Sequence, residues 1–540
     1  MARSSHCRLL SLPDELLDAI LGRIDHPPDR SNVALCCSRL HRLLRSTPLA
    51  LRVNFLSCTN PIGAREWCKQ LKHFSVTFTL ITEVSVEIPV RLENRLLAAL
   101  GSSCPELKKL AIQARFHTTP RDAEVWRTFA RKCSQLTLLD LGPPTSADTP
   151  LRAKPALPPL DAFPSLQSFV LGFVPKKIAS LRRCSSLTSL GLWDPKGSTI
   201  LSLASSSSFR LSLHSLCIES ADLRDCLECI SSFPRLASLA LLACKFHAHE
   251  LHTLSLSLQT LTRLFIDNCP RVCTSSVAAM VRANSSLSTL SLTGDSYHLL
   301  RSEGIAPKLR FLRLSRLSAF SPGVLADCSL DHLLIEKSQL SLEDLACMLV
   351  REKEREEVVQ GEGEGVEQSG GTRTAAEALE RSESETSADT ICASVDMLML
   401  TNIHFIPLPQ PGLLLPRGPI MPPPLSIAAS NMFGRLKKLT MWRCTGLGEQ
   451  RLASLLHDCL GLMELTVEHS EDMSDAVLLG SRLEVLTCLT LLACDRITAD
   501  GVAGFLGAFP RLSDLKVEVE KITPETREEF VRAGVVMRGV

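Results

Sequence analysis

The stretch LASLALLACKFHAHELHTLSLSLQTLTRLFIDNC, from Leu236 to Cys269, contains one short pattern twice. The segments LASLAL and LTRLFI begin at Leu236 and Leu261, 25 residues apart, and both carry apolar residues at the first, fourth and sixth positions. In an extended strand the fourth and sixth side chains share one face, and the third and fifth share the other. Each segment therefore predicts a short strand with one buried face.

This pattern recurs at a nearly constant period. It begins at Leu187, Leu213, Leu236, Leu261 and Leu287, at spacings of 26, 23, 25 and 26 residues, and again at Leu436, Leu462, Leu486 and Leu512, at spacings of 26, 24 and 26. Segments starting at Ile81 and Leu107 extend the series backward. Helical patterns such as SSVAAMVRA and EQRLASLLHDC lie between the predicted strands. A period in the twenties with this template is the signature of leucine-rich repeats.

One strand and one helix cannot bury their apolar faces alone, so such units stack into a continuous core. The predicted fold class is therefore α/β, a leucine-rich-repeat solenoid (horseshoe) with strands on the concave side and helices on the convex side. The stretch before the repeats predicts an all-helical head, described below.

Eight of the 21 cysteines stand at fixed offsets from the repeat template. One group stands eight residues after the first leucine of its repeat and comprises Cys244, Cys269, Cys444 and Cys494. A second group precedes a strand pattern by three residues and comprises Cys104, Cys133, Cys184 and Cys459. This regularity resembles the cysteine-containing subclass of leucine-rich repeats and favours thiols packed as small apolar groups. The alternative is zinc binding, but the CxxC formed by Cys226 and Cys229 has no second pair nearby at ligand spacing. We expect neither metal nor cofactor.

Bulk composition excludes other classes of protein. Charged residues make up 22% of the chain and the formal net charge is +1, which argues against general nucleic-acid binding. We see no apolar run of about 18 residues to span a membrane and no secretory signal. We therefore expect a reducing compartment, the nucleus or the cytoplasm, and no membrane partner.

The beginning of the chain reads as a helical hairpin. Pro13 suits the first turn of a helix, and Asp14 and Glu15 suit the positive end of its dipole. Pro27 and Pro28 end that helix, and a second apolar helical pattern follows. The stretch from about Leu10 to Ser46 resembles an F-box, most densely in LPDELL (residues 12–17). Cys37 stands where that family usually has its cysteine, and Leu40 stands where the family usually has tryptophan.

The F-box resemblance implies a division of labour. In the family, the F-box binds a Skp-type adaptor and, through it, a cullin, while the repeats bind the protein to be ubiquitinated. The expected adaptor surface is apolar and comprises Leu12, Pro13, Leu16, Leu17, Ile20 and Leu21. The chain itself is then no enzyme, and the sequence has no GxSxG, P-loop, HExxH or Gly-rich dinucleotide motif.

Two other functions stay open at this point. A run from Asp29 to Val33, with Leu35 and Cys37, looks like the F-box of plant hormone receptors, which would imply a small ligand on the repeats. The other alternative is an interaction scaffold whose F-box no longer engages the adaptor. The hairpin itself could also be only a cap that shields the first repeat.

Two segments interrupt the array. Residues 351–389 hold 12 acidic and 5 basic residues, a net charge of −7, so the rest of the chain carries about +8. Such a segment cannot bury enough apolar surface to offset its ordering entropy.

The second segment is rich in proline, with eight prolines between Pro407 and Pro424. It predicts either an extended surface loop or a ligand for SH3-type domains.

The expected organisation is a flexible N-terminus (1–9), an F-box (10–47), a first run of repeats (48–350), a disordered acidic insert (351–394), an irregular repeat with the Pro-rich loop (395–435) and the last repeats (436–540). The partner site is expected on the concave face between Leu261 and Ile335, where the third and fifth positions are distinctive. The candidate residues are Arg263, Phe265, Thr289, Ser291, Phe311, Arg313 and His332. Small side chains flanked by phenylalanine and arginine predict a recess for an acidic peptide or a carboxylate ligand.

Overall fold

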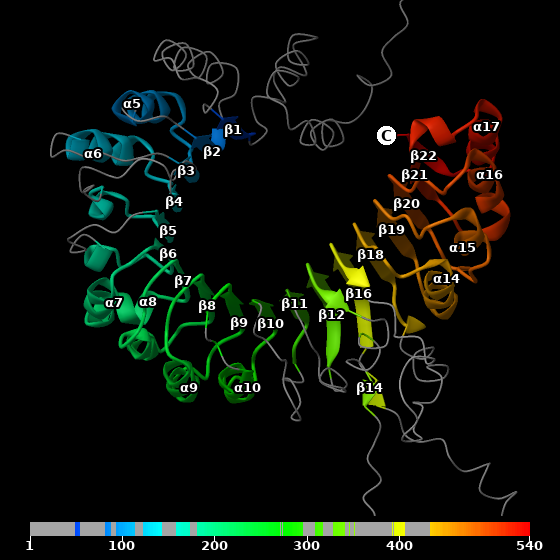
Figure 1. Ribbon diagram of the computed structural model, residues 1–540. Helices are drawn as coiled ribbons and strands as arrows, with labels where there is room; N and C mark the ends of the chain where they lie inside the picture. Colours follow the sequence, from blue (N-terminus) through cyan, green and yellow to red (C-terminus); the bar gives the residue numbers. More distant parts are fainter. Residues whose placement is uncertain are drawn as a thin grey trace, which may run out of the picture. The chain divides into compact units, whose positions relative to one another are not determined.

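The computed structural model describes residues 49–54, 81–87, 93–113, 122–142, 158–172, 181–294 without 271 and 273, 308–316, 328–340, 345, 350–351, 391–392, 394–405 and 433–539. The chain forms two compact units, Met1–Leu261 and Thr262–Val540. In each unit the main sheet is parallel, with the helices on the opposite side from its inner face (Figure 1).

The first unit carries strands that pair in chain order. They are β1 (Leu49–Asn54), β2 (Ile81–Glu87), β3 (Lys109–Gln113), β4 (Leu138–Leu141), β5 (Ser168–Leu171), β6 (Ser189–Trp193), β7 (Ser215–Glu219) and β8 (Ser238–Leu242). Each strand is parallel to the next. Behind them lie α5 (Glu93–Ser103), α6 (Asp122–Lys132), α7 (Gly197–Ala204), α8 (Ser207–Ser212) and α9 (Ala248–Ser257). Three connections are single 3₁₀ turns, namely η2 (Leu160–Ala162), η3 (Leu181–Arg183) and η4 (Leu227–Ser232).

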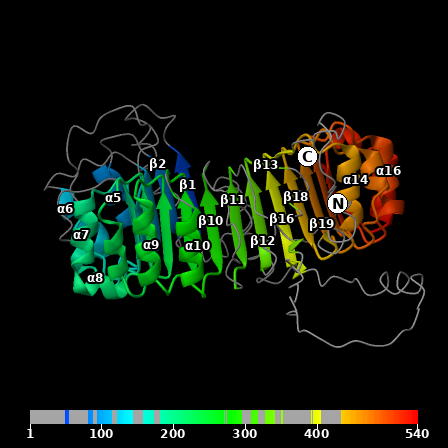
Figure 2. The same ribbon diagram turned by 60° about the horizontal axis from the view of Figure 1, so that its bottom comes forward.

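The second unit repeats the arrangement. Its strands are β9 (Arg263–Asp267), β10 (Thr289–Thr293), β11 (Phe311–Ser315), β12 (Ser329–Glu336), β16 (Ser394–Thr401), β18 (Lys438–Trp442), β19 (Glu464–Glu468), β20 (Cys488–Leu492), β21 (Asp514–Val517) and β22 (Val536–Gly539). They pair in parallel in that order (Figure 2). The helices are α10 (Thr274–Ala283), α14 (Glu449–Asp458), α15 (Asp475–Leu479), α16 (Ala499–Ala508), α17 (Pro524–Arg532) and the 3₁₀ turn η5 (Val519–Lys521).

The two ends of the acidic segment lie side by side. β14 (Val350–Arg351) pairs antiparallel with β15 (Ile391–Cys392), and β16 follows directly. Beyond β16, β17 (His404–Phe405) pairs with β13 (Gln339–Leu340). The sheet therefore passes from β12 to β16 without a missing strand, although 57 residue positions (337–393) separate them. Residues 352–390 lie outside the described residues, as does the Pro-rich stretch.

The core confirms the repeat predicted from the sequence. Each strand from β6 to β10 and from β18 to β21 begins two residues after the first leucine of its template. The fourth and sixth positions are buried, as Leu239, Leu241, Leu264 and Ile266 illustrate with no exposed surface. The predicted helices at SSVAAMVRA and EQRLASLLHDC are α10 and α14. The last strand, β22, and the helix α17 before it were not expected from the sequence, because their residues do not follow the leucine template.

A left-handed residue follows most strands of the second unit. Those residues include Asn268, Arg316, Lys337, Asn402, Arg443 and His469, with φ between 48° and 58°. Their backbone N–H groups still donate to the neighbouring strand, as from Arg316 to Glu336 O (2.9 Å) and from Arg443 to Glu468 O (2.9 Å). The ladder thus extends one residue beyond these strands and places a left-handed residue at the carboxyl end of each, with Asn268, Arg316, Lys337, Arg443 and His469 exposed. We call this line of positions the carboxyl rim.

Candidate functional site

The expected adaptor surface cannot be placed. Leu12, Pro13, Leu16, Leu17, Ile20 and Leu21 lie outside the described residues. The adaptor site therefore remains a prediction from the sequence.

The seven residues expected on the inner face share four neighbouring strands, β9 to β12. Backbone pairing sets Arg263 beside Thr289, Thr289 beside Phe311, and Phe311 beside His332. A second row, deeper along the strands, contains Phe265, Ser291 and Arg313. Both rows belong to the second unit, and their members alternate with buried leucines. The structure therefore brings all seven residues to one face.

The small residues of this face are less accessible than their polarity suggests. Ser291 is 5% exposed and Thr293, two positions along β10, is 8% exposed. Phe265 and Phe311 are half-buried, whereas Arg263 and His332 are exposed. A partner on this face therefore meets the larger side chains of β9, β11 and β12 first.

Arg313 is engaged by a carboxylate of the next strand. Its Nε and Nη2 donate to Glu336 Oε2 at 3.1 and 2.7 Å. The Glu336 side chain is 19% exposed and that of Arg313 is 43% exposed. The guanidinium that the sequence offered for gripping a foreign carboxylate is thus already satisfied within the sheet. Any incoming anion must displace Glu336 or bind elsewhere.

Two methionines continue the site onto the next strand. Met397 pairs with His332 and Met399 with Leu334 across the β12–β16 boundary. His332 Nδ1 lies 3.1 Å from Met397 Sδ, and its ring centroid is 6.0 Å from that of Phe311. We call Phe311, His332, Leu334, Met397 and Met399 the soft patch, since its side chains are apolar or polarisable. The segment VDMLML contains the same template, so its third and fifth positions were a signal for both methionines.

Charged pairs border the soft patch at the amino ends of the strands. Arg310 and Asp331 lie 3.4 Å apart, Lys437 and Asp396 lie 3.1 Å apart, and Lys438 and Glu464 lie 2.7 Å apart. Arg310, Lys437 and Lys438 therefore each have a carboxylate partner. Because these pairs are exposed, they contribute little to stability but leave no unpaired charge among themselves.

The carboxyl rim differs in this respect. Within the part of the chain that the structure describes, no carboxylate lies within ion-pair distance of Arg316, Lys337 or Arg443. Nη1 of Arg316 donates to Asn268 Oδ1 at 3.0 Å, and the Arg443 guanidinium lies 4.6 Å from the ring centroid of Trp442. Three cations on β11, β12 and β18 thus face solvent beside the soft patch. The sequence analysis did not single out these cations, nor Trp442, because they follow the template rather than belong to it.

The repeat cysteines are structural. All eight positions predicted from their spacing are buried, and the Sγ atoms of Cys244 and Cys459 donate to Ile218 O (3.3 Å) and Leu455 O (3.1 Å). Burial raises the pKa of the Cys104, Cys133 and Cys459 thiols to about 12. The protonated thiol therefore persists at neutral pH and neither attacks an electrophile nor binds a metal readily. Among the described residues, no three histidine, cysteine or carboxylate side chains gather as metal ligands.

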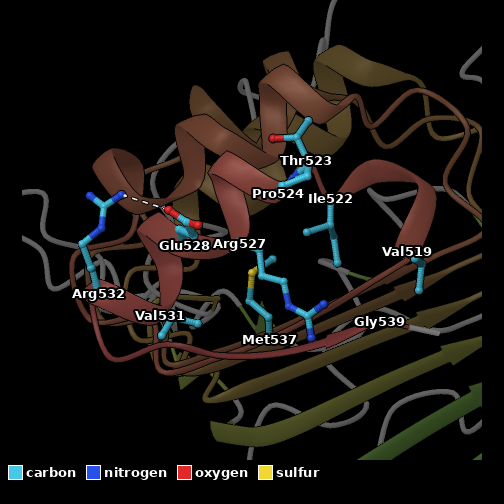
Figure 3. Close-up of a pocket in the computed structure, with 10 residues that line it drawn as sticks. All are labelled: Val519, Ile522, Thr523, Pro524, Arg527, Glu528, Val531, Arg532, Met537 and Gly539. Carbon is cyan, nitrogen blue, oxygen red and sulfur yellow. Dashed lines mark ion pairs between the residues drawn. The ribbon is translucent and has the colours of Figure 1, made fainter.

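A groove lies at the end of the second unit. It has a volume of about 790 Å³ and runs between η5, α17 and β22 (Figure 3). Val519, Ile522, Val531 and Met537 supply its apolar wall, and an exposed pair, Arg532 with Glu528 at 4.0 Å, lies beside it. Gly539 packs closely there, because a Cβ atom on it would lie 2.6 Å from Val519 Cγ2. None of these residues belonged to the predicted site.

No helix in the described parts of the chain is both long and apolar enough to cross a membrane. The sequence matches no protein-family model and no curated protein.

Several solved structures resemble this one. A leucine-rich-repeat protein of Leptospira interrogans is 13% identical, with 89% of this chain and 98% of that chain covered and a TM-score of 0.34. An internalin of Listeria monocytogenes is 17% identical, with coverage of 61% and 87% and a TM-score of 0.30. Rad7, from the yeast complex of Rad7 and Elc1, is 12% identical, with coverage of 98% and 93% and a TM-score of 0.32. At these identities the likeness concerns only the fold. The parallel strands, their period and their buried leucines identify the chain as a leucine-rich-repeat protein.

Proposed function

We propose that this protein is the substrate-recognition subunit of a cullin-type ubiquitin ligase, acting in the nucleus or the cytoplasm. Residues 10–47 bind a Skp-type adaptor as an F-box, and the repeats bind the protein to be ubiquitinated. The chain then supplies binding and orientation, and the chemistry of ubiquitin transfer belongs to its partners.

The observation that supports this proposal is a combination of two features in one chain. An F-box-like stretch precedes an array whose buried positions are nearly constant and whose outward positions vary in size and charge from strand to strand. A scaffold fixed by its core and free to vary on one face is suited to recognising one partner surface. The soft patch offers large half-buried side chains beside exposed His332, and the carboxyl rim adds three exposed cations.

Adaptor binding is the first test. The full chain is mixed with a purified Skp-type adaptor, and complex formation is followed by gel filtration and calorimetry. The double variant Leu16→Asp/Leu17→Asp should abolish binding, because two carboxylates replace the apolar centre of the expected contact. Circular dichroism should show the repeats still folded. Unchanged adaptor binding by the double variant, or none by the unaltered chain, would favour a hairpin that only caps the repeats.

Recruitment is the second test. Proteins captured by the intact chain with the proteasome blocked are compared with those captured by Arg263→Glu/Arg313→Glu. Loss of recruited proteins with adaptor binding intact supports recognition by strands β9 to β12. Recruitment that requires an added small molecule would instead identify a ligand-dependent co-receptor in the same ligase. Retained recruitment by the charge-reversed pair would place the partner site elsewhere on the array.

A further inference from the structure

The cations around the soft patch indicate what kind of partner this face recognises. On the amino-end side, the cations of Arg310, Lys437 and Lys438 are each matched by a carboxylate of a neighbouring strand. On the carboxyl-end side, Arg316, Lys337 and Arg443 are exposed and matched by no described carboxylate. The carboxyl-end border of the soft patch therefore carries three exposed cations that no described carboxylate neutralises.

The spacing of the two features suits a single chain segment. Along one strand, the step from Arg313, level with Leu334 and Met399, to Arg316 is three residues, or about 10 Å. Across the sheet, Lys337 and Arg443 follow β12 and β18, which are two strand spacings or about 9.6 Å apart. An extended segment of about six residues covers both the soft patch and these two rim cations, because it advances about 3.3 Å per residue.

We propose that the soft patch and the carboxyl rim together bind a protein segment in which bulky apolar side chains stand next to aspartate or glutamate. The apolar side chains lie on Phe311, Leu334 and Met399, and the carboxylates reach Lys337 and Arg443. This inference rests on the proposed function, since it names the chemical class of the segment through which the ligase substrate is recruited.

The side chains of the patch favour apolar occupants of variable shape. Met397 and Met399 are unbranched and polarisable, so they adjust to different partners and make favourable contacts with aromatic rings. The half-buried ring of Trp442, held against the Arg443 guanidinium, adds a rigid surface at the border. Apolar side chains supply the affinity here, and the rim cations attract the carboxylates of the bound segment.

Acidic side chains beside the rim argue against a nucleic acid. Asp267, Glu336 and Glu468 occupy the strand positions immediately before left-handed residues of the rim. A phosphodiester backbone carries one charge per nucleotide and would pass close to these carboxylates. Isolated carboxylates on a peptide can instead be placed opposite the cations alone.

The arrangement of the rim also favours carboxylates over phosphates. A phosphate group is best bound by several clustered arginines with paired hydrogen bonds. Here the rim offers single cations after β11, β12 and β18, and Arg316 and Arg443 are already oriented by Asn268 and Trp442. Such single contacts match single negative charges.

A peptide selection on the full chain tests the proposal. Random 16-residue peptides displayed on phage are selected on the immobilised protein, and the best peptides are synthesised and measured by fluorescence polarisation. We expect a consensus with at least two acidic residues next to a bulky apolar residue. Replacing the acidic residues of the best peptide by lysine, or its apolar residues by serine, should each weaken binding about tenfold or more.

Matched variants locate the site. Lys337→Glu/Arg443→Glu and Met399→Glu should each weaken binding of the best peptide about tenfold or more. The controls are Lys516→Glu, a charge reversal on the same face of β21, and Met463→Glu, an exposed methionine just before β19. Both controls should bind within about twofold of the unaltered chain. A charge-swap experiment identifies the contact even if Met399→Glu unfolds the chain. The peptide whose acidic residues are replaced by lysine should regain affinity for Lys337→Glu/Arg443→Glu.

Four results overturn the proposal: no enrichment, a consensus without acidic residues, binding only after serine phosphorylation of the peptides, or a single-stranded oligonucleotide bound in their place. Equal binding by the control and site variants overturns it as well. Adaptor binding is measured on the same preparations. Intact adaptor binding without peptide binding contradicts this inference alone, whereas peptide binding without adaptor binding contradicts the proposed ligase function alone.

Discussion

The strands of the two units share one pattern of buried leucines, but their outward side chains differ in size and charge. On β5 to β8 of the first unit, the third template positions are Ser168, Ser189, Ser215 and Ser238, and the fifth are Val170, Gly191, Cys217 and Ala240. On β9, β11, β12 and β16 of the second unit the same positions carry arginine, phenylalanine, histidine, leucine and methionine, and only β10, between β9 and β11, keeps small residues, Thr289 and Ser291. Because only the outward residues differ, the fold is separable from the recognition surface it displays.

The largest expected effect is a loss of stability at equivalent buried leucines, and it tests whether the two units depend on the same core positions. Leu239→Ala in the first unit and Leu465→Ala in the second each remove a side chain that is at most 1% exposed. Each should lower the free energy of unfolding by about 3 kcal/mol, through lost burial and the cavity left behind. Denaturant unfolding followed by circular dichroism measures the change. The outward neighbour Thr466→Ala should cost less than about 0.5 kcal/mol, and a similar cost at both kinds of position would break the distinction.

The buried thiols predict a loss of stability in alkali in both units. Burial raises the pKa of Cys104 and Cys133 in the first unit, and of Cys459 in the second, to about 12. In the unfolded chain these thiols ionise near pH 8.5. Between that pH and 12 the folded state holds protons that the unfolded state has released, so stability falls as pH rises, by about 1.4 kcal/mol per pH unit for each thiol.

Melting temperatures between pH 7.5 and 10.5 measure this loss. Cys459→Ala provides the control, since it removes one thiol from the pH dependence even though it lowers the starting stability. A flat stability profile to pH 10.5, or rapid reaction of these thiols with a disulfide reagent in the folded protein, contradicts the assignment.

A smaller effect is expected at Gly191, where packing explains why the inner face of the first unit carries small side chains. A Cβ atom on Gly191 would lie 3.1 Å from both Cγ atoms of Val170 on the neighbouring strand. Gly191→Ala should therefore cost about 1 kcal/mol through overpacking, and Val170→Ala in the same chain should relieve it. Gly507→Ala in α16 is the control, because nothing lies within 4 Å of its Cβ position and alanine favours the helix. No cost at Gly191 would mean that packing does not limit this face.

The smallest effect concerns the acidic segment. Its ends are joined by the pairs Val350 with Cys392 and Arg351 with Ile391. Replacing residues 352–390 by an Asn-Gly turn should leave the melting temperature nearly unchanged, because the antiparallel pair already brings the ends together. Differential scanning calorimetry of both chains gives the comparison. A large decrease would show that the segment packs on the repeats.

The leucine template alone determined the fold. Its buried positions recur every 23 to 26 residues, and a strand with one apolar face must stack on its neighbours whatever its outward residues are. The spacing of the cysteines likewise predicted their burial, because a residue at a fixed offset in each repeat meets the same surroundings. The local sequence pattern was sufficient to predict burial wherever successive repeats give a residue the same surroundings.

Tertiary structure decided the chemistry of the face. Arg313 looked available in the sequence, but its partner Glu336 lies on the next strand, 23 residues away. His332 meets Met397 across 65 residues, because the sheet continues from β12 to β16 past the interruption. The rim cations are exposed because Arg316, Lys337 and Arg443 adopt a left-handed backbone that their residue types do not favour. Contacts between outward side chains depend on which strands lie next to each other. The repeat template specifies only the buried positions, so it does not determine these contacts.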